Sequence, residues 1–324
     1  MELHEKIYVA GHTGLVGSAL VRKLKLHGYH NLIMRNQNEL DLRNQEATNK
    51  FFRDERPAFV FLAAAQVGGI WANMNFPALF IYDNLAIELN VIHAAFNHTV
   101  KKLLFFGSSC IYPRLCPQPM REEYLMTGSF EPTNQPYAVA KIAGIELCQA
   151  YNKQYGIRFI SCMPTNLYGP GDNFDEQHSH VIPGLIARMY RTKIMQQPMV
   201  TIWGTGTQLR EFLFVDDLAD AAIFLMNHYE DSLPINIGVG SDVTIAELAY
   251  LIKELINYPG KLFFDTTKPD GAPRKLLNVD RLGTLGWRAQ TELAQGIHMT
   301  IISYIELLHA AHKPPIQSVD LSCH

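Results

Sequence analysis

The sequence has little of what marks secreted, membrane-spanning or nucleic-acid-binding chains. Its five cysteines include no C-x-x-C pair and no regular spacing, so a disulfide framework and a structural zinc site both explain them poorly. The 28 Lys and Arg against 31 Asp and Glu leave no basic excess for a nucleic-acid backbone. No apolar stretch reaches the ~20 residues that span a bilayer, and no cleavage-like site follows the charged N-terminus. We therefore expect a soluble, cytoplasmic protein with no nucleic-acid partner, no membrane partner and no metal.

Apolar residues make up 48% of the chain, which is enough to bury a large core. Short apolar runs alternate with stretches of helical periodicity, a pattern typical of parallel strands joined by crossover helices. We expect strands at residues 6–10, 31–35, 59–63 and 102–106, and helices at 15–26, 44–53 and 81–96. The sequence thus predicts an α/β fold with a doubly wound (Rossmann) parallel sheet and a smaller C-terminal α/β region.

A glycine-rich turn follows the first predicted strand and opens the first predicted helix. Gly11, Gly14 and Gly17 form a G-x-x-G-x-x-G spacing there. Glycines in this context permit a tight turn, let the backbone approach a pyrophosphate and bring the helix against the strand. We expect these three glycines to bind a dinucleotide cofactor.

The ends of the next two strands bear on which dinucleotide is bound. An NAD enzyme places an acidic residue after the second strand, whereas this chain has Arg35. A guanidinium there suits a 2′-phosphate and favours NADP; the alternative is a solvated charge at a strand end. Asp41 either reaches the adenine amine or lies in an exposed turn. Ala63 and Ala64 either let a flat cofactor pass close to the backbone or serve tight core packing.

Three candidate catalytic residues come from the fourth strand and from the helix after a proline-rich loop. Ser108 lies at the carboxyl edge of the predicted sheet, where it donates to a substrate carbonyl or caps the next turn. Tyr137 and Lys141 are four residues apart and share a helix face. A cation about 4 Å from a partly buried phenol lowers its pKa from ~10 by roughly three, which makes Tyr137 a usable acid. The alternative is a packed tyrosine beside a lysine that extends to solvent.

The pattern changes near residue 165, and we place a domain boundary there. Residues 1–165 are expected to form the dinucleotide-binding domain, to which later segments can return. Residues 166–312 are expected to form mainly a substrate-binding domain, and residues 313–324 a disordered tail.

Two aromatic or basic residues of the second domain suit a nucleoside diphosphate. Trp203 offers a stacking face and Arg210 a guanidinium fork, with a core tryptophan and a surface arginine as the alternatives. His180 is the one histidine that we separate from the others, because it stands directly before an apolar helix. The acidic residues at 216–220 begin a helix and are expected to have a structural role.

Seven stretches, spanning most of the chain, together resemble the extended short-chain dehydrogenase/reductase family. They are AGHTGLVGSA (10–19), LAAAQVGGI (62–70), GSSCIYP (107–113), EPTNQPYAVAKIAG (131–144), MPTNLYGP (163–170), SHVIP (179–183) and REFLFVDDLA (210–219). Within this family the chain is similar to the bifunctional enzymes that epimerise and reduce GDP-4-keto-6-deoxy-D-mannose.

The resemblance implies a two-stage reaction. The 4-keto group acidifies the C3 and C5 protons of the hexose, and the family assigns Cys110 as the base and His180 as the acid that invert both centres. Hydride transfer from NADPH to C4 completes the reaction. Tyr137 is implied to donate the proton, with Lys141 tuning it and Ser108 polarising the carbonyl.

The resemblance also implies a GDP site and a homodimer. Arg188, Trp203 and Arg210 are expected to hold the GDP portion, and Asn166 to line the pocket. The helix that carries Tyr137 and the helix that ends near residue 96 are expected to form the dimer contact.

Two positions depart from the family pattern and bear on the cofactor. The family often has basic residues where this chain has Thr13 and Gln37, both expected near the adenosine 2′-phosphate. Because only Arg35 remains, use of NADH is an alternative to strict use of NADPH.

Three alternatives to this function stay open. The first is a related enzyme for another GDP-keto sugar, such as the one that leads to GDP-L-colitose. The second is a reductase that skips epimerisation, against which Cys110 and His180 argue. The third is a non-catalytic NADP-sensing protein, against which the presence of Ser108, Tyr137 and Lys141 argues.

Overall fold

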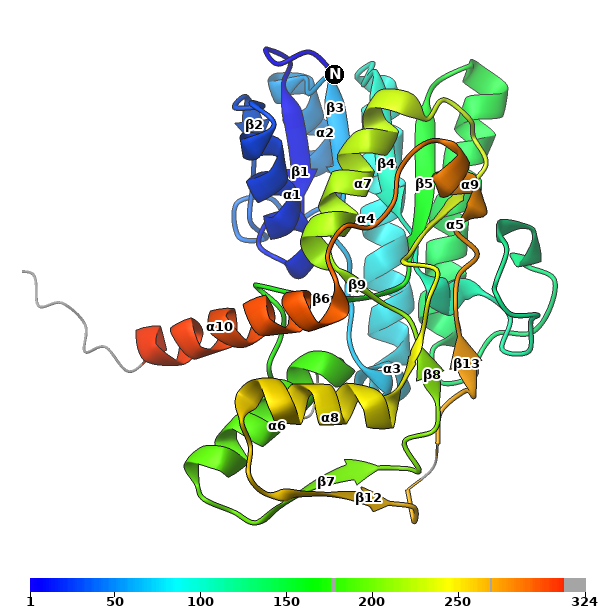
Figure 1. Ribbon diagram of the computed structural model, residues 1–324. Helices are drawn as coiled ribbons and strands as arrows, with labels where there is room; N and C mark the ends of the chain where they lie inside the picture. Colours follow the sequence, from blue (N-terminus) through cyan, green and yellow to red (C-terminus); the bar gives the residue numbers. More distant parts are fainter. Residues whose placement is uncertain (176–178, 269, 312–324) are drawn as a thin grey trace, which may run out of the picture.

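A six-stranded parallel sheet forms the upper part of the molecule in the computed structural model (Figure 1), which describes residues 1–175, 179–268 and 270–311. The predicted tail at 313–324 lies outside the described residues. The strands are β1 (Ile7–Ala10), β2 (Leu32–Ile33), β3 (Phe59–Leu62), β4 (Lys102–Phe106), β5 (Phe159–Pro164) and β10 (Ile235–Ile237). They lie in the order β10-β5-β4-β3-β1-β2 and every pair is parallel, which confirms the doubly wound α/β fold.

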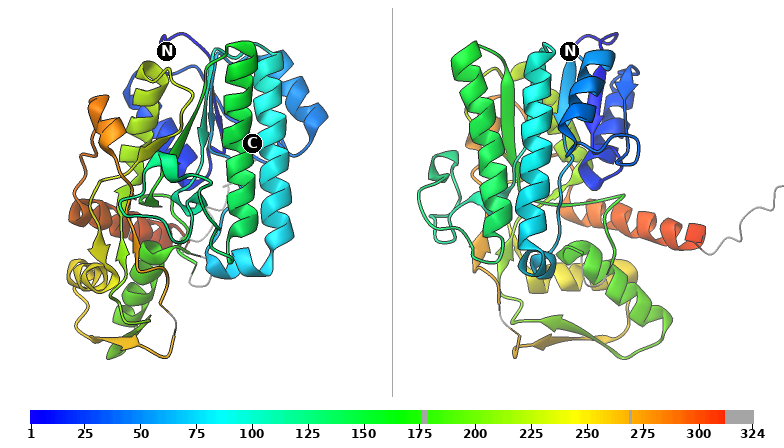
Figure 2. Two further views of the ribbon diagram at one scale, coloured as in Figure 1. Left: turned by 90° about the vertical axis from the view of Figure 1, so that its right-hand side faces the viewer. Right: turned by 180° about the vertical axis from the view of Figure 1, so that it is seen from behind.

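Helices cover both faces of this sheet and bury its apolar strands. On one face lie α1 (Leu15–Leu26) and α7 (Val215–His228); on the other lie α2 (Gln45–Glu55), α4 (Pro77–Asn97) and α5 (Gln135–Tyr155). The second layer faces the viewer in the right-hand view of Figure 2. Because α7 and β10 come from the later chain, the sheet domain is completed by segments beyond residue 165.

Local sequence sets where the long helix α5 begins and ends. A proline stands in its first turn, where the missing N–H costs nothing because that group has no helical partner. The helix ends at Gly156, whose φ of 67° lies in the left-handed region that glycine adopts without strain. These two signals fix a 21-residue helix that carries both Tyr137 and Lys141.

A smaller unit packs below the carboxyl edge of the sheet around a core of its own. Its helices are α6 (Val181–Ile194), α8 (Ile245–Ile256) and α10 (Leu293–Ala311). Its short strands pair as β7 (Met199–Trp203) with β12 (Lys261–Asp265), β6 (Asn166–Tyr168) with β9 (Phe212–Phe214), and β8 (Leu209–Arg210) with β11 (Val243–Thr244) and β13 (Arg274–Lys275). The remaining short elements are α3 (Ile70–Asn75), α9 (Asp280–Thr284) and 3₁₀ turns at Ser109–Ile111 and Glu122–Tyr124.

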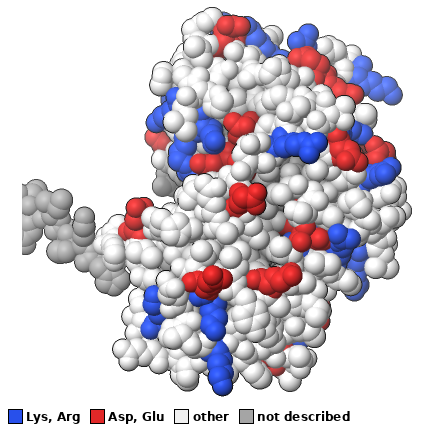
Figure 3. All heavy atoms as spheres, viewed as in Figure 1, with Lys and Arg blue, Asp and Glu red and all other residues white. Residues whose placement is uncertain are grey.

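Within the part of the chain that the structure describes, α4 is a helix long and apolar enough to cross a membrane by length and composition alone. This differs from the sequence analysis, which found no such run. Residues Asp83, Asn84 and Glu88 interrupt the apolar character of α4, and all three are buried against the rest of the protein. Packing against the sheet and α5 accounts for the apolar residues between them. On the face shown in Figure 3, Lys and Arg are interspersed with Asp and Glu.

A buried carboxylate joins the sheet domain to the smaller unit. Glu211 stands between β8 and β9 and accepts hydrogen bonds from the backbone N–H groups of Val239 (2.7 Å), Gly240 (2.7 Å) and Leu277 (3.0 Å). Burial raises the pKa of Glu211, and these hydrogen bonds oppose that rise. Two chain segments, both distant from Glu211 in sequence, therefore depend on its side chain.

We expect Glu211→Ala to destabilise the fold strongly. It would leave three backbone N–H groups without their partner, each costing about 1–3 kcal/mol, so the free energy of unfolding should fall by roughly 3 kcal/mol or more. Urea unfolding followed by circular dichroism measures this change. Glu254→Ala, on the exposed side of α8, is the control and should stay within about 0.5 kcal/mol of the parent. Equal stability of the two variants would contradict the proposed clamp.

Candidate active site

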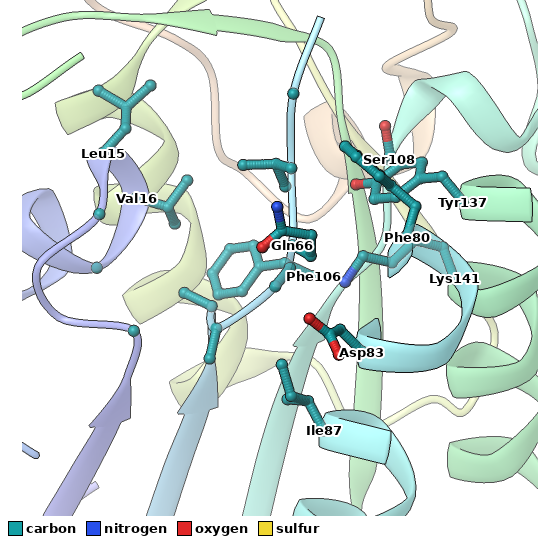
Figure 4. Close-up of a pocket in the computed structure, with 18 of the residues that line it drawn as sticks. Leu15, Val16, Gln66, Phe80, Asp83, Ile87, Phe106, Ser108, Tyr137 and Lys141 are labelled. Carbon is teal, nitrogen blue, oxygen red and sulfur yellow. The ribbon is translucent and has the colours of Figure 1, made fainter. Parts of the chain in front are cut away.

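A cavity of about 450 Å³ opens at the carboxyl ends of β1, β3 and β4. This is where the strand order reverses, and open α/β sheets bind their ligands at such a point. In Figure 4, Leu15 and Val16 of α1 lie on one side of the cavity, and Ser108, Tyr137 and Lys141 lie on the other. Of the sequence-predicted residues, the cavity is lined by Gly11, Gly14, Gly17, Arg35, Asp41, Ala63, Ala64, Ser108, Cys110, Tyr137, Lys141, Asn166 and His180.

The turn after β1 requires its glycines for steric reasons. Gly11 has φ +83°, and a Cβ there would lie 2.7 Å from the Ala64 backbone. A Cβ on Gly17 would lie 2.1 Å from the Gly11 carbonyl oxygen, far inside van der Waals contact. The turn and the residues after β3 therefore touch through backbone atoms, which explains the glycine at position 11, and the close packing of the turn on itself explains the glycine at position 17.

The N-terminus of α1 fits the pyrophosphate of a dinucleotide. Its N-cap is Gly14, which supplies no side-chain hydrogen bond, and Leu15, Val16 and Gly17 of the first turn line the cavity. The first N–H groups of a helix lack helical partners and carry the positive end of the helix dipole. These donors face the space where the predicted cofactor would place its phosphates.

The adenosine end of the cavity differs in detail from the expectation. Arg35 lines it, but its Nη2 contacts Glu55 Oε1 at 2.7 Å and its guanidinium lies over the Phe51 ring. The Asp41 carboxylate accepts from Arg43 Nε (2.9 Å) and Nη2 (2.8 Å), so it is already engaged. The contact of Asp41 with an adenine amine stays a prediction. Arg43 also lines the cavity and was not anticipated.

Ser108 and Tyr137 meet where β4 ends and α5 begins. The Ser108 hydroxyl accepts the Cys110 N–H at 3.2 Å, so it caps the 3₁₀ turn as well as lining the cavity. The Tyr137 ring packs edge-on against Phe80, with centroids 6.3 Å apart. These contacts fix the direction of the phenol before any ligand is bound.

The expected acidification of Tyr137 by Lys141 is corrected by the structure. Burial raises the pKa of Tyr137, with smaller contributions from Cys110 and Glu88, and only contact with Ser108 lowers it. The Lys141 ammonium instead contacts Glu88 Oε1 of α4 at 3.1 Å, and both side chains are almost fully buried. The Lys141 ammonium is therefore paired with Glu88 of α4.

Cys110 and His180 line the same cavity but come from different parts of the chain. Cys110 lies in the turn after β4, and His180 is the N-cap of α6. His180 is exposed to solvent, and neighbouring protein atoms lower the pKa of its imidazole by desolvation. A permanent cation does lie within electrostatic range: burial lowers the pKa of Arg210, and Cys110 counteracts that lowering.

The other residues expected to hold substrate are distributed over the smaller unit. Asn166 lines the cavity and donates to the Glu211 carbonyl oxygen at 2.8 Å. Arg188, Trp203 and Arg210 do not line it. Arg188 donates to the Thr201 carbonyl oxygen, and Trp203 is 67% exposed. Their roles toward GDP stay predictions.

Sequence reasoning missed an amide clamp behind the cavity. Asn84 of α4 accepts the Gln66 N–H (2.9 Å) and donates to the Gln66 carbonyl oxygen (3.0 Å), which holds the loop after β3. Phe80, one turn earlier, accepts from the same amide and packs on Tyr137. Asparagine in an otherwise apolar helix was the available signal.

Comparisons with known proteins agree with this geometry. The sequence profile of the NAD dependent epimerase/dehydratase family matches residues 7–238. GDP-L-fucose synthase 1 of Arabidopsis thaliana is 54% identical over 93% of each chain. A GDP-L-fucose synthetase from Naegleria fowleri, solved with NADP bound, superposes with a TM-score of 0.90 at 32% identity and covers 97% of this chain and 96% of its own. GDP-mannoheptose C4 reductase from Campylobacter jejuni, also solved with NADP bound, gives a TM-score of 0.87 at 40% identity over 94% of this chain and 99% of its own.

We expect Gly17→Ala to abolish cofactor binding and to lower thermal stability, because its Cβ would overlap the Gly11 carbonyl oxygen. The quenching of intrinsic fluorescence by added NADPH, together with a thermal melt, measures both effects. Gly283→Ala in α9 is the matched control, since a Cβ there has nothing within 4 Å. Unchanged affinity in Gly17→Ala would show that the turn does not hold the cofactor.

Proposed function

Because the chain belongs to the NAD dependent epimerase/dehydratase family, we propose that it converts GDP-4-keto-6-deoxy-D-mannose into GDP-L-fucose. It is an NADP-dependent oxidoreductase with epimerase activity, as in the GDP-L-fucose synthases that it resembles. The observation that carries the proposal is the shared cavity. It brings a thiol and an imidazole, Cys110 and His180, together with the reductase residues Ser108, Tyr137 and Lys141.

NADPH supplies the hydride for C4 when it is bound. The glycine turn and the N-terminus of α1 would hold its pyrophosphate, and Arg35 would face its 2′-phosphate. Thr13 and Gln37 line the same end of the cavity and add no charge. Because Glu55 already neutralises part of the Arg35 charge, Arg35 would discriminate less strongly for the 2′-phosphate, and we propose partial use of NADH as well.

Cys110 and His180 would carry out the epimerisations. The thiolate of Cys110 removes the proton from C3 or C5, and the electron pair passes into the 4-keto group to give an enolate. His180 returns a proton to the opposite face of the same carbon, which inverts it. Arg210 lies within electrostatic range of Cys110 and brings a positive charge to this end of the cavity.

Ser108, Tyr137 and Lys141 would carry out the reduction. The Ser108 hydroxyl donates to the C4 carbonyl oxygen and orients it. Tyr137 gives its phenolic proton to that oxygen as C4 becomes tetrahedral, and the tyrosinate that forms is stabilised by the Lys141 ammonium. The phenol starts protonated at neutral pH, because burial raises its pKa.

The alternative functions differ in which residues of this cavity they would use. A reductase without epimerase activity has no use for Cys110 and His180, and a non-catalytic sensor has no use for Tyr137. An enzyme for another GDP-keto sugar, such as the precursor of GDP-L-colitose, would use the same residues. Choice of substrate is therefore the point that experiment must decide.

Reaction with GDP-4-keto-6-deoxy-D-mannose and NADPH in deuterated water tests the function. We expect proton NMR to show deuterium at C3 and C5 and a reduced C4 in the product. Cys110→Ser and His180→Gln should lose the exchange, and Tyr137→Phe should keep it while slowing reduction by about 10²–10⁴-fold. Reduction without deuterium would show hydride chemistry alone and would remove the assigned roles of Cys110 and His180.

We also propose a homodimer in which α4 and α5 pack against the same helices of a second copy. These helices lie side by side on the surface that faces the viewer in the right-hand view of Figure 2. Leu79, Tyr82 and Leu89 of α4 are 43%, 69% and 50% exposed and follow one helix face. Exposed apolar side chains arranged in this way suit a helix-to-helix interface.

Light scattering after size exclusion tests this dimer. The parent protein should have twice the mass of one chain, and Leu89→Arg should run as a monomer, because it would bury a charge in the interface. Leu307→Arg is the matched control: Leu307 is similarly exposed on α10, away from α4 and α5, and its variant should stay dimeric. A monomeric parent would contradict the proposal.

A further inference from the structure

A carboxylate is buried behind the catalytic lysine, where the proposed reaction has no use for it. Glu88 comes from the middle of α4, and its side chain is 2% exposed. Its Oε1 lies 3.1 Å from the Lys141 Nζ, which is itself 3% exposed. Lys141 lines the cavity and Glu88 does not, so the carboxylate contacts the lysine from the side of the protein interior.

The side chains around Glu88 pack closely on its ion pair with Lys141. Within residues 1–175, 179–268 and 270–311, neither carboxylate oxygen has a well-aligned hydrogen-bond donor, and the Lys141 ammonium is the charge partner of Glu88. The ammonium also lies over the Phe105 ring, 4.6 Å from the centroid. A Cβ on Gly144 would lie 2.9 Å from Glu88 Oε2 and 2.5 Å from Phe105 Cζ, so a glycine is needed to let α5 approach.

Stability alone does not account for this arrangement. Burying two charges costs several kcal/mol each, and a single contact without further hydrogen bonds repays this poorly. Apolar residues at both positions would avoid that cost, but the reaction needs Lys141, and a buried ammonium needs a charge partner. A buried, weakly satisfied ion pair next to a catalytic group is more readily explained by a role in the chemistry.

Glu88 is the group that titrates near neutrality in this cluster. Burial raises its pKa to about 7, and Lys141 opposes the rise. From α5, Tyr137 and Cys148 also face it, and from β5 Cys162 faces Lys141; burial raises the pKa of all three, so they stay protonated near pH 7.

Among the residues that the structure describes, Lys141 is the charged group that acts on Glu88. Arg43, just before α2, forms ion pairs with Asp41 and Asp83. In β4 the Lys102 ammonium donates to the carbonyl oxygens of Leu225 and Met226 on the other face of the sheet. The short helix α3 contains no titratable side chain.

We propose that Glu88 is a positioning residue that controls where the Lys141 ammonium lies and, through it, the acidity of Tyr137. When Glu88 is ionised, it holds the ammonium toward the sheet. When Glu88 takes a proton from solvent, the attraction is lost and the ammonium turns to the cavity, where it stabilises the tyrosinate formed during reduction. The kinetic part of this inference rests on the proposed function; the ion pair and its titration do not.

Infrared spectroscopy tests the ion pair directly. The parent protein should show a C=O stretch of a protonated buried carboxyl that disappears as the pH rises through about 7, and Glu88→Gln should lack it. In Lys141→Met the midpoint should move to higher pH, because the neighbouring positive charge is gone. If Glu88→Gln does not fold, Glu88→Asp and Lys141→Met still decide the matter. A midpoint that is the same with and without Lys141 would overturn the proposal.

Single-turnover reduction tests the consequence for catalysis. A raised pKa means that Glu88 is protonated below about pH 7 and ionised above it, so the parent rate of NADPH oxidation should fall by roughly tenfold between pH 6 and 8. Glu88→Gln mimics the protonated state and should lose this fall, with little change in KM for the sugar. Glu254→Gln, on the exposed side of α8 and away from the cavity and from α4 and α5, should keep the parent profile. A Glu88→Gln profile equal to the parent would overturn the proposal, whereas a parent without turnover but with the infrared titration would overturn only the proposed function.

Discussion

The close backbone contact between the turn after β1 and the end of β3 determines how the rest of the site is arranged. A Cβ on Gly11 would lie 2.7 Å from the Ala64 backbone, so the two strand ends can meet only if the turn carries no side chain there. This contact places the N-terminus of α1 at the cavity, and the parallel pairing of β3 with β4 brings Ser108 to the neighbouring position. The cofactor end and the catalytic end of the cavity therefore lie on either side of the end of β3.

What could be predicted from the sequence is what depends on neighbours along the chain. Glycine spacing, helix periodicity and apolar strands located β1, α1, β4 and α5, because each signal acts within a few residues. The predicted strand at 31–35 ends at Ile33, because Asn36 Oδ1 accepts the N–H groups of Asn38 and Glu39 and turns the chain. That turn chemistry was present in the sequence and was overlooked.

What could not be predicted is what joins distant segments. Glu88 is 53 positions from Lys141, and Glu211 reaches backbone groups near residues 239 and 277; no local pattern marks such pairs. The return of β10 to the sheet edge has the same cause, since parallel pairing with β5 is a contact between separate regions. The contact between Lys141 and Glu88 was invisible in the sequence for this reason, and so was the raised pKa of Tyr137, because burial within the assembled fold causes it.

The positions of the two pairs of proton-transfer groups explain how one cavity can serve two kinds of chemistry. Tyr137 and Lys141 stand on a rigid helix whose buried side is fixed by Glu88, Phe105 and Gly144. Cys110 and His180, in contrast, come from a turn and a helix end on different units, so their separation depends on how the units meet. The buried Glu88 carboxylate positions Lys141 beside Tyr137, whereas the domain interface sets the distance between Cys110 and His180. Changes in the domain interface should therefore alter epimerisation before they alter reduction.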